Sequence, residues 1–381
     1  ELYQQLSKLS EEDLYVFLQK AGRDQKARFK SDLIQINERV YNWENRIEKD
    51  IELRAKCYYA SLVLFTFSEI KKLNWMAYGN IKNDMAMTIF KDLKPDWLTE
   101  YFDYILSENF RSYDYIRKYY VEGLIPKPSN PNYIIGLISL PERLRFRDKD
   151  NTDNLYNFLR ENADALEDFW KVFEVEGVAE ANMSSIEKYG GKPFWDQTIL
   201  KLITTKIIDR KKVLTKTFEP LRREWIQFRS GWFTRFHEYL QPTIEERKEH
   251  EQQYLQLLSN SIPTNKSFAI KALTILSKNN LLDQKAFVNS CEHVLISDKK
   301  SLVNSTIKIL KRISDKDRSF NVAISEKIVQ ALFLQDAGIQ KEVFKVLEKT
   351  VKNKIEFQSK LDPYTDLIVP SVKREFTSWH T

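Results

Sequence analysis

The sequence predicts an all-α protein whose C-terminal part is a solenoid of stacked helix pairs, and three observations lead to this fold class. First, the 381 residues include only 9 Gly, which leaves little turn chemistry for a fold of many strands. Second, apolar residues recur at helical spacing through most of the chain. Third, one apolar helix face occurs three times, in residues 271–276, 305–310 and 342–347, at intervals of about 34 and about 37 residues. Two-helix repeats have this length, and each needs its neighbours to bury its apolar stripe.

Caps and apolar spacing predict the helices of the N-terminal part. Ser10 and Asp13 are close to a capping box, and Gly22 is placed to end the helix that follows them. Residues 25–69 are predicted to be helical throughout. Pro95 stands where another helix can begin, and a wide apolar face follows it. That face consists of Trp97, Leu98, Tyr101, Phe102, Ile105 and Leu106.

Prolines, glycines and polar runs predict the breaks in the middle of the chain. Three prolines exclude a helix from residues 123–131, and residues 145–154 form a polar loop without periodicity. We expect one helix over residues 155–173 and a second firm break at 190–193. From 194 to 240 the chain is predicted to be helical again, with Pro220 and Gly231 as ends or kinks.

The repeats are predicted to follow a capping box made by Thr243 and Glu246. Asp283 and Asp298 are expected to be N-caps of repeat helices. The predicted helices pair as 267–278 with 283–297 and as 299–313 with 320–333, and 336–351 opens a third pair. The third pair lacks an obvious second helix, so either the native protein continues or residues 362–381 fold back as a cover. The predicted organisation is an irregular helical region over 1–260, repeats over 261–355, and a tail or partial cap over 356–381.

Charge and cysteine content limit the cellular setting. The formal charge of +6 is mild for this size and mixed along the chain, so nucleic-acid binding is not favoured. Cys57 and Cys291 are expected to be buried free thiols, which favours the cytoplasm. The apolar run at 58–67 is too short to span a bilayer, so no membrane anchor is predicted. The sequence lacks an initiator Met and opens within a helical pattern, as a fragment would, so the absence of a signal peptide decides little.

Residues 218–243 form the densest group of chemically interesting side chains. Arginines between aromatic residues can stack on bases and grip phosphates, or they can anchor a protein partner. We interpret the aromatic residues mainly as the buried face of an amphipathic helix, and the arginines as candidate partner-binding residues. The aromatic residues are Trp225, Phe228, Trp232, Phe233, Phe236 and Tyr239, and the arginines are Arg222, Arg223, Arg229 and Arg235.

No motif predicts catalysis, a cofactor or a metal. The four histidines lack the spacing of a helical metal site, and no cysteine lies beside them at ligand spacing. His237 and Glu238 are adjacent, which places their side chains on different helix faces. The chain contains neither a glycine-rich phosphate loop nor a nucleophile elbow, and no small-molecule substrate is evident.

Several of these segments together resemble a known family. Residues 209–210, 230–243, 272–273 and 280–283 resemble an uncharacterised bacterial family of HEAT-like helical-repeat proteins, a domain of unknown function. Residues 95–98 and 116–125 are similar to the N-terminal half of that family, so the resemblance covers most of the chain. It implies a HEAT-like α-α superhelix and a cytoplasmic scaffold, associated with genes for MoxR-type AAA+ ATPases, von Willebrand A-domain proteins and WGR/SWIM-type proteins. It assigns no catalytic residue.

Two hypotheses for the function follow. The first is a non-enzymatic protein-interaction scaffold, with an AAA+ ATPase system as the partner that the resemblance suggests. The alternative is a DNA-binding protein or a glycosylase like those with DNA-alkylation repeats, which use HEAT-like helices around a basic groove. Such an enzyme needs Trp, Asp and basic residues on the inner helices. The repeat helices here carry lysines interspersed with Glu and Asp and contain no Trp, which favours the scaffold.

Overall fold

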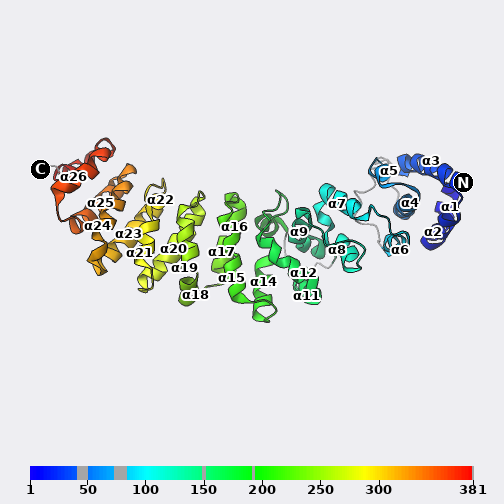
Figure 1. Ribbon diagram of the computed structural model, residues 1–381, viewed down its shortest axis with the longest axis horizontal. Coiled ribbons are helices and arrows are strands. Elements are labelled where there is room, and N and C mark those ends of the chain that lie inside the picture. Colours follow the sequence, from blue (N-terminus) through cyan, green and yellow to red (C-terminus); the bar gives the residue numbers. More distant parts are fainter. Residues whose placement is uncertain (41–49, 73–83, 148–151, 191–193, 380–381) are drawn as a thin grey trace. The chain divides into compact units, whose positions relative to one another are not determined.

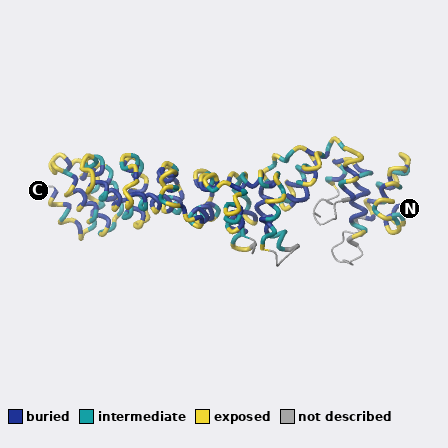
Figure 2. The backbone as a smooth tube through the Cα atoms, turned by 90° about the horizontal axis from the view of Figure 1, so that it is seen from below, coloured by how far each residue is buried: buried dark blue, intermediate teal, exposed yellow. Residues whose placement is uncertain are grey.

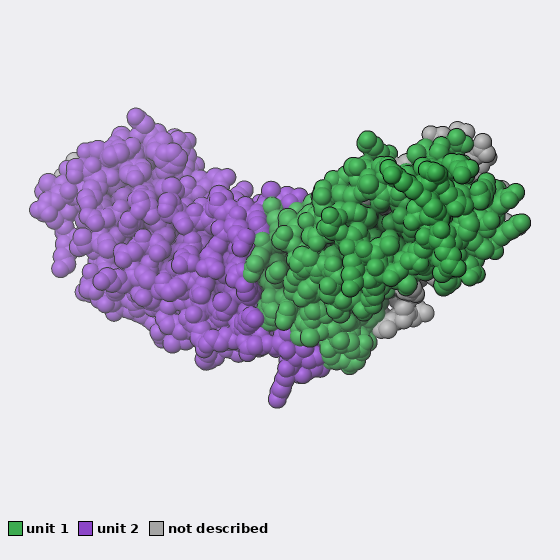
Figure 3. Space-filling view, turned by 45° about the vertical axis from the view of Figure 1, so that its right-hand side comes forward, with its two compact units in different colours: residues 1–182, 189–193 green, residues 183–188, 194–381 purple. Residues whose placement is uncertain are grey.

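The computed structural model describes residues 1–40, 50–72, 84–147, 152–190 and 194–379, and within these ranges it contains helices and no strand. The all-α prediction is therefore confirmed. The chain forms two compact units, Glu1–Asn182 with Tyr189–Pro193, and Met183–Lys188 with Phe194–Thr381 (Figure 3). The boundary predicted at residue 260 falls inside unit 2, and the division into an irregular region and regular repeats stays a prediction.

Unit 1 begins with helices that pack around α4. These are α1 (Leu2–Lys8), α2 (Glu11–Lys20), α3 (Arg23–Val40), α4 (Asp50–Leu64), α5 (Phe67–Lys72) and α6 (Asp84–Leu93). The Ser10 hydroxyl accepts a hydrogen bond from the Asp13 backbone N–H at 3.0 Å, and α2 ends before Gly22, as predicted. Residues 25–69 are not one helix, because α5 starts anew at a cap in which Thr66 N–H donates to Glu69 Oε2 at 2.7 Å. Parts of the predicted segments 25–69, 145–154 and 190–193, including Trp43, lie outside the described residues.

In the second half of unit 1, one predicted break between helices is confirmed, and a second break is present that the sequence did not predict. Its elements are α7 (Leu98–Glu108), η3 (Phe110–Ser112), α8 (Tyr113–Val121), α9 (Pro131–Ile138), α10 (Leu140–Arg147), α11 (Asn154–Glu161), α12 (Ala163–Phe169) and η4 (Trp170–Phe173). The segment rich in proline between α8 and α9 is not helical, as predicted. The single helix predicted over 155–173 is wrong, because Asn162 has an extended backbone between α11 and α12. Its side chain holds the break by donating to Phe158 O at 2.7 Å and accepting from Arg117 Nη2 at 2.8 Å.

The core of unit 1 is rich in buried tyrosines and contains the buried carboxylate of Asp168. The hydroxyls of Tyr58 and Tyr101 lie 2.7 Å apart, and both side chains are buried. Asp168 is fully buried, lies 2.8 Å from Lys127 Nζ and accepts a 3.1 Å hydrogen bond from the Tyr113 hydroxyl. A buried carboxylate of this kind is tolerable only with such partners, so Asp168 ties α12 to the start of α8 and to the segment that follows α8.

Unit 2 begins with short helices whose breaks differ from the predicted ones. They are α13 (Met183–Ser185), the π-helical turn η5 (Ile186–Gly190), α14 (Trp195–Thr204), α15 (Arg210–Lys216), α16 (Phe218–Arg222), α17 (Gln227–Tyr239), α18 (Ile244–Glu249), α19 (Glu251–Gln256) and η6 (Leu257–Ser259). Pro220 and Gly231 were predicted as ends or kinks, yet both lie inside helices. Pro220 is the third residue of α16, where a backbone N–H has no helical partner to lose. The breaks fall instead at 205–209 and 223–226.

Helices are present in the rest of unit 2 where the sequence predicts the repeat helices, but the helix predicted over 283–297 is divided at Cys291 into two short helices. The helices of this part are α20 (Pro263–Lys278), α21 (Gln284–Ser290), α22 (Glu292–Leu295), α23 (Lys300–Lys316), η7 (Arg318–Phe320), α24 (Asn321–Ile328), η8 (Val329–Phe333) and α25 (Ala337–Thr350). Helices α20, α23 and α25 pack side by side in one row, and α21, α22 and α24 pack beside them as a second row (Figure 1). Along each of these helices buried segments alternate with exposed ones (Figure 2), and Leu276, Leu310 and Leu347 of the repeated face are buried.

Two of the three predicted caps in unit 2 are confirmed. Thr243 and Glu246 form a complete capping box at α18, and the Asp283 side chain accepts from Ala286 N–H at the start of α21. The prediction for Asp298 is wrong, because α23 begins at Lys300 with Lys299 as its N-cap residue.

The residues after α25 fold back against it. They form α26 (Lys354–Leu361), η9 (Asp362–Leu367), η10 (Pro370–Val372) and α27 (Lys373–Thr377). Helix α27 and η10 pack on α25, and the buried Trp379 ring lies 6.4 Å from the Phe344 ring. The buried Gln340 amide donates to Leu332 O and Leu367 O at 3.1 and 2.9 Å and accepts from Val369 N–H at 3.0 Å. Residues 354–379 therefore form a cover on α25, and we use this name for them below.

Candidate functional site

The turn between α16 and α17 contains most of the arginines singled out in the sequence. Arg222 is the last residue of α16, Arg223 begins the turn, and Arg229 lies in the first turn of α17. Arg222 and Arg223 are exposed, whereas Arg229 is half-buried. We call residues 222–229 the arginine turn.

The arginine turn is held from beneath by three contacts. Glu224 has a left-handed backbone (φ 54°), and its Oε1 accepts a hydrogen bond from Ser261 N–H at 2.8 Å. The Asn260 amide donates to Leu221 O at 2.8 Å, just before the turn. The buried Trp225 ring packs edge-on against Phe233. Anchors on both sides of the chain fix the conformation in which the turn presents its other side chains.

Two large apolar side chains on the arginine turn are exposed. Ile226 is 57% exposed and Phe228 is 47% exposed, while Trp232, Phe233 and Phe236 of the same segment are buried. The interpretation of the aromatic residues as a buried face is therefore confirmed for Trp225 and these three rings, and wrong for Phe228 and Tyr239. Ile226 was missed because periodicity does not separate exposed from buried apolar residues at a helix start.

Arg235 lies apart from the other three arginines. It is six residues beyond Arg229 on α17, about 9 Å along the helix axis. Its Nη2 lies 2.5 Å from Glu187 Oε2 of η5, in an ion pair that is largely exposed to solvent. The structure thus groups Arg222, Arg223 and Arg229 and gives Arg235 a different neighbourhood.

His237, on the other side of α17, is buried in a polar cluster. The Thr217 hydroxyl donates to Leu214 O at 2.6 Å, so it accepts from His237 Nδ1–H at 2.8 Å. Nε2 of the same ring then accepts from the Tyr254 hydroxyl at 2.7 Å. Burial lowers the pKa of His237 from 6.5 to about 3, which agrees with a neutral ring that uses both nitrogens. His237 therefore joins α16, α17 and α19 and has no nitrogen left for a substrate.

Glu238 is engaged on a different face of α17, as expected from its position beside His237. Arg247 binds both of its oxygens, at 2.8 and 3.2 Å, and Lys271 Nζ lies 3.2 Å from Oε2. Burial alone would raise the pKa of Glu238, but the two cations outweigh it and the pKa is lowered. Glu238 therefore stays ionised and links α17 to α18 and α20.

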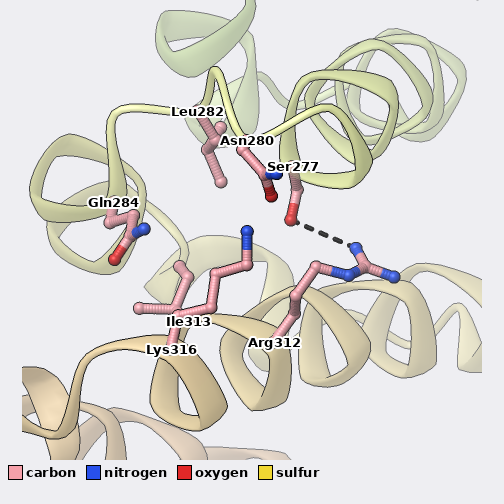
Figure 4. A pocket seen from close by; sticks show the side chains of 7 residues that line it. All are labelled: Ser277, Asn280, Leu282, Gln284, Arg312, Ile313 and Lys316. Carbon is pink, nitrogen blue, oxygen red and sulfur yellow. Dashed lines mark hydrogen bonds between the residues drawn. The ribbon is translucent and has the colours of Figure 1, made fainter.

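A small pocket, partly open to solvent, lies between the end of α20 and the last turns of α23 (Figure 4). Arg312 Nη1 donates to Ser277 Oγ at 3.1 Å across it, and the Lys316 side chain points toward Asn280. No carboxylate lines it. Its lining residues are Ser277, Asn280, Leu282, Gln284, Arg312, Ile313 and Lys316. This pocket was not predicted from the sequence, where its signal is the spacing of two cations, four residues apart, at the end of a predicted repeat helix.

The described residues offer no metal cluster and no reactive thiol. Within the ranges given above, no group of three or more His, Cys, Asp or Glu side chains could hold a metal ion. Burial raises the pKa of both Cys57 and Cys291 to about 12, so they are protonated thiols in the core. Among the same residues, no helix is both long enough and apolar enough to cross a bilayer.

Comparison with known proteins identifies a family. A family model described as a domain of unknown function (DUF6493) matches residues 1–301. No curated protein and no solved structure matches the chain.

Proposed function

The chain belongs to the DUF6493 family of domains of unknown function, and we propose that it is a non-enzymatic protein-interaction scaffold built as a HEAT-like α-α superhelix. The two rows of repeat helices in unit 2 support this architecture, since α23 packs between α20 and α25 and each helix buries its apolar face on its neighbours. An arrangement of this kind leaves the outer faces of the helices available for a partner.

The observation that carries the proposal is the arginine turn. It combines exposed Ile226 and Phe228 with arginines, and interface hot spots are enriched in aromatic residues and arginine. Because Glu224 and Trp225 anchor the turn, its backbone conformation is held before a partner arrives. Binding would then lose less conformational entropy than binding to a mobile loop.

The surroundings of the turn support binding in preference to catalysis. His237 is neutral with both nitrogens bound, and Glu238 is bound by two cations. These residues have the contacts of a helix junction. An AAA+ ATPase as partner and a bacterial source belong to the proposal through the sequence resemblance alone. The cytoplasm as location rests on that resemblance and on the buried free thiols of Cys57 and Cys291.

The test is affinity purification of the full-length protein from its own host at about 0.15 M salt, where exposed charge contacts are largely screened. We expect one discrete protein to be recovered with the wild type and lost with the I226A/F228A double variant. V322A/F333A is the matched control, because Val322 and Phe333 are exposed apolar residues of the same unit away from α16 and α17.

Each outcome bears on the proposal. Recovery of an AAA+ ATPase that depends on Ile226 and Phe228 would identify the partner system. Recovery of the same protein with I226A/F228A as with the wild type would remove the arginine turn from the interface. Recovery of nucleic acid that is lost on raising the salt would favour the DNA-binding alternative.

A further inference from the structure

We propose that the pocket between α20 and α23 binds an oxyanion, a carboxylate or phosphate group, through Arg312 and Lys316. The two cations stand four residues apart, on adjacent turns of one helix face, where like charges repel each other. The lining contains no carboxylate to relieve this repulsion. An oxyanion held between the two side chains would supply the missing negative charge.

Arg312 is oriented for this task by a neutral partner. Its Nη1 donates to the Ser277 hydroxyl at 3.1 Å, and Arg312 is only partly exposed. A guanidinium carries five N–H donors in a planar fork that fits a carboxylate or phosphate in bidentate fashion. The hydrogen bond to Ser277 uses one donor and fixes the direction of the fork.

Lys316 makes no ion pair or hydrogen bond with its side chain in the part of the chain that the structure describes, and its ammonium points into the pocket (Figure 4). The two carboxylates beside it in sequence are engaged elsewhere. Asp315 lies 3.6 Å from Lys349 Nζ, and Asp317 accepts from Ser319 N–H at 2.9 Å. By contrast, Lys300 at the other end of α23 is paired with Asp336 at 2.5 Å.

The rest of the pocket suits a single small anionic group. The side-chain amides of Asn280 and Gln284 line it and can donate to oxygen, and the left-handed backbone of Asn280 (φ 64°) at the end of α20 fixes where its side chain starts.

Two sources can supply such a group: a free small oxyanion, or an acidic side chain of a protein partner. The proposal does not depend on the scaffold function, because binding of inorganic phosphate is measured without any partner. It also involves none of the residues of the arginine turn, so either proposal can fail while the other stands.

The experiment uses the full chain and two probes. Inorganic phosphate is titrated by calorimetry at constant ionic strength, and a fluorescein-labelled oligoglutamate peptide is titrated by anisotropy. Wild-type protein is expected to bind at least one probe, and K316Q and R312Q should each weaken that binding about tenfold. N280G keeps the left-handed backbone but removes the amide, and it should weaken binding by a smaller factor. K341Q and R374Q change exposed cations outside the pocket and should bind as the wild type does.

The outcomes separate the sources. Tighter binding of the peptide than of phosphate, lost in K316Q, supports the proposal with a partner side chain as the ligand. Binding of phosphate at least as tight, with the same loss, supports it with a free oxyanion. The proposal is overturned if neither probe binds the wild type, or if K316Q and R312Q bind as the wild type does. Lys316 has no side-chain partner among the described residues, so K316Q removes only its favourable charge at the C-terminus of α23, a small cost in stability.

Discussion

His237 shows how one buried residue can set the acid stability of unit 2. In the folded protein both ring nitrogens are bound and the pKa is about 3, whereas the unperturbed value is 6.5. The unfolded chain therefore binds a proton between these two values while the folded chain does not. The stabilisation by the neutral ring is complete above about pH 6.5 and is lost as the pH falls toward about 3.

We predict that H237F is less stable than the wild type at neutral pH by about 1–3 kcal/mol, because Tyr254 loses its hydrogen-bond partner. The difference should shrink as the pH falls, at up to about 1.4 kcal/mol per pH unit below the unfolded pKa. Urea denaturation between about pH 7 and about pH 5 measures it. A difference that stays constant over this range would show that His237 does not titrate on unfolding.

The roles of the individual candidate residues were partly predictable from the sequence. The sequence identified the arginines and placed His237 and Glu238 on different helix faces. It could not show that Phe228 is exposed while Trp232 is buried, because that depends on which neighbours cover the start of α17. It also could not identify the pocket, which combines residues from three segments that only the tertiary structure brings together.

At the scale of helices, two glycines inside helices have opposite roles. Gly136 of α9 lies against η3, where an added Cβ would overlap Phe110 O and approach Tyr113 Cβ to 2.9 Å. Gly231 of α17 has room, since the nearest atom to an added Cβ is Arg235 Nη1 at 3.5 Å. The first glycine permits close packing of two elements, while the second has no such packing role.

We predict that G136A destabilises the protein by about 1–3 kcal/mol through overpacking. G231A should stabilise it by about 0.4–1 kcal/mol, because alanine restricts the unfolded chain at a position that is already helical. Thermal or urea unfolding of both variants beside the wild type measures the two effects. A loss of stability in G231A would mean that α17 needs a glycine at that position.

Helix existence was more predictable than helix boundaries. Repeat spacing located α20, α23 and α25, since a buried apolar face has a helical period wherever it occurs. Boundaries failed where tertiary contacts decide them. Asn162 breaks a helix because Arg117 binds its side chain, and Pro220 is tolerated because it falls early in α16. Neither the contact between Arg117 and Asn162 nor the residue at which α16 begins can be read from the local sequence.

For the molecule as a whole, the pairing of basic residues with carboxylates disfavours nucleic acid as the partner. The net charge is +6, and lysines of the repeat helices pair with carboxylates, as Lys271 does with Glu238, Lys300 with Asp336 and Lys349 with Asp315. Paired cations release few counterions when they meet DNA. The burial of Trp225 and Trp232 also removes two rings that could have stacked on bases.

We therefore predict no specific binding of duplex DNA at about 0.15 M salt, measured by fluorescence anisotropy with a labelled duplex. At low salt a weak association that disappears on adding salt is compatible with the net charge. Saturable binding that persists at about 0.15 M salt and falls in R222A/R223A would instead favour the DNA-binding alternative.

Gln340 has a consequence for how this protein can change in evolution. When the three repeated faces are aligned, the position of Gln340 in α25 corresponds to Val303 in α23 and Ala269 in α20, all fully buried. Only Gln340 can bind the backbone of the cover, through Leu367 O and Val369 N–H. A gene duplication that copies α23 and α24 would insert a unit with the apolar residue that stacking requires. A copy of α25 placed inside the row would carry a buried amide with no backbone to bind. Growth of the row by duplication is therefore expected ahead of α25, with Gln340 and the cover inherited unchanged at its end.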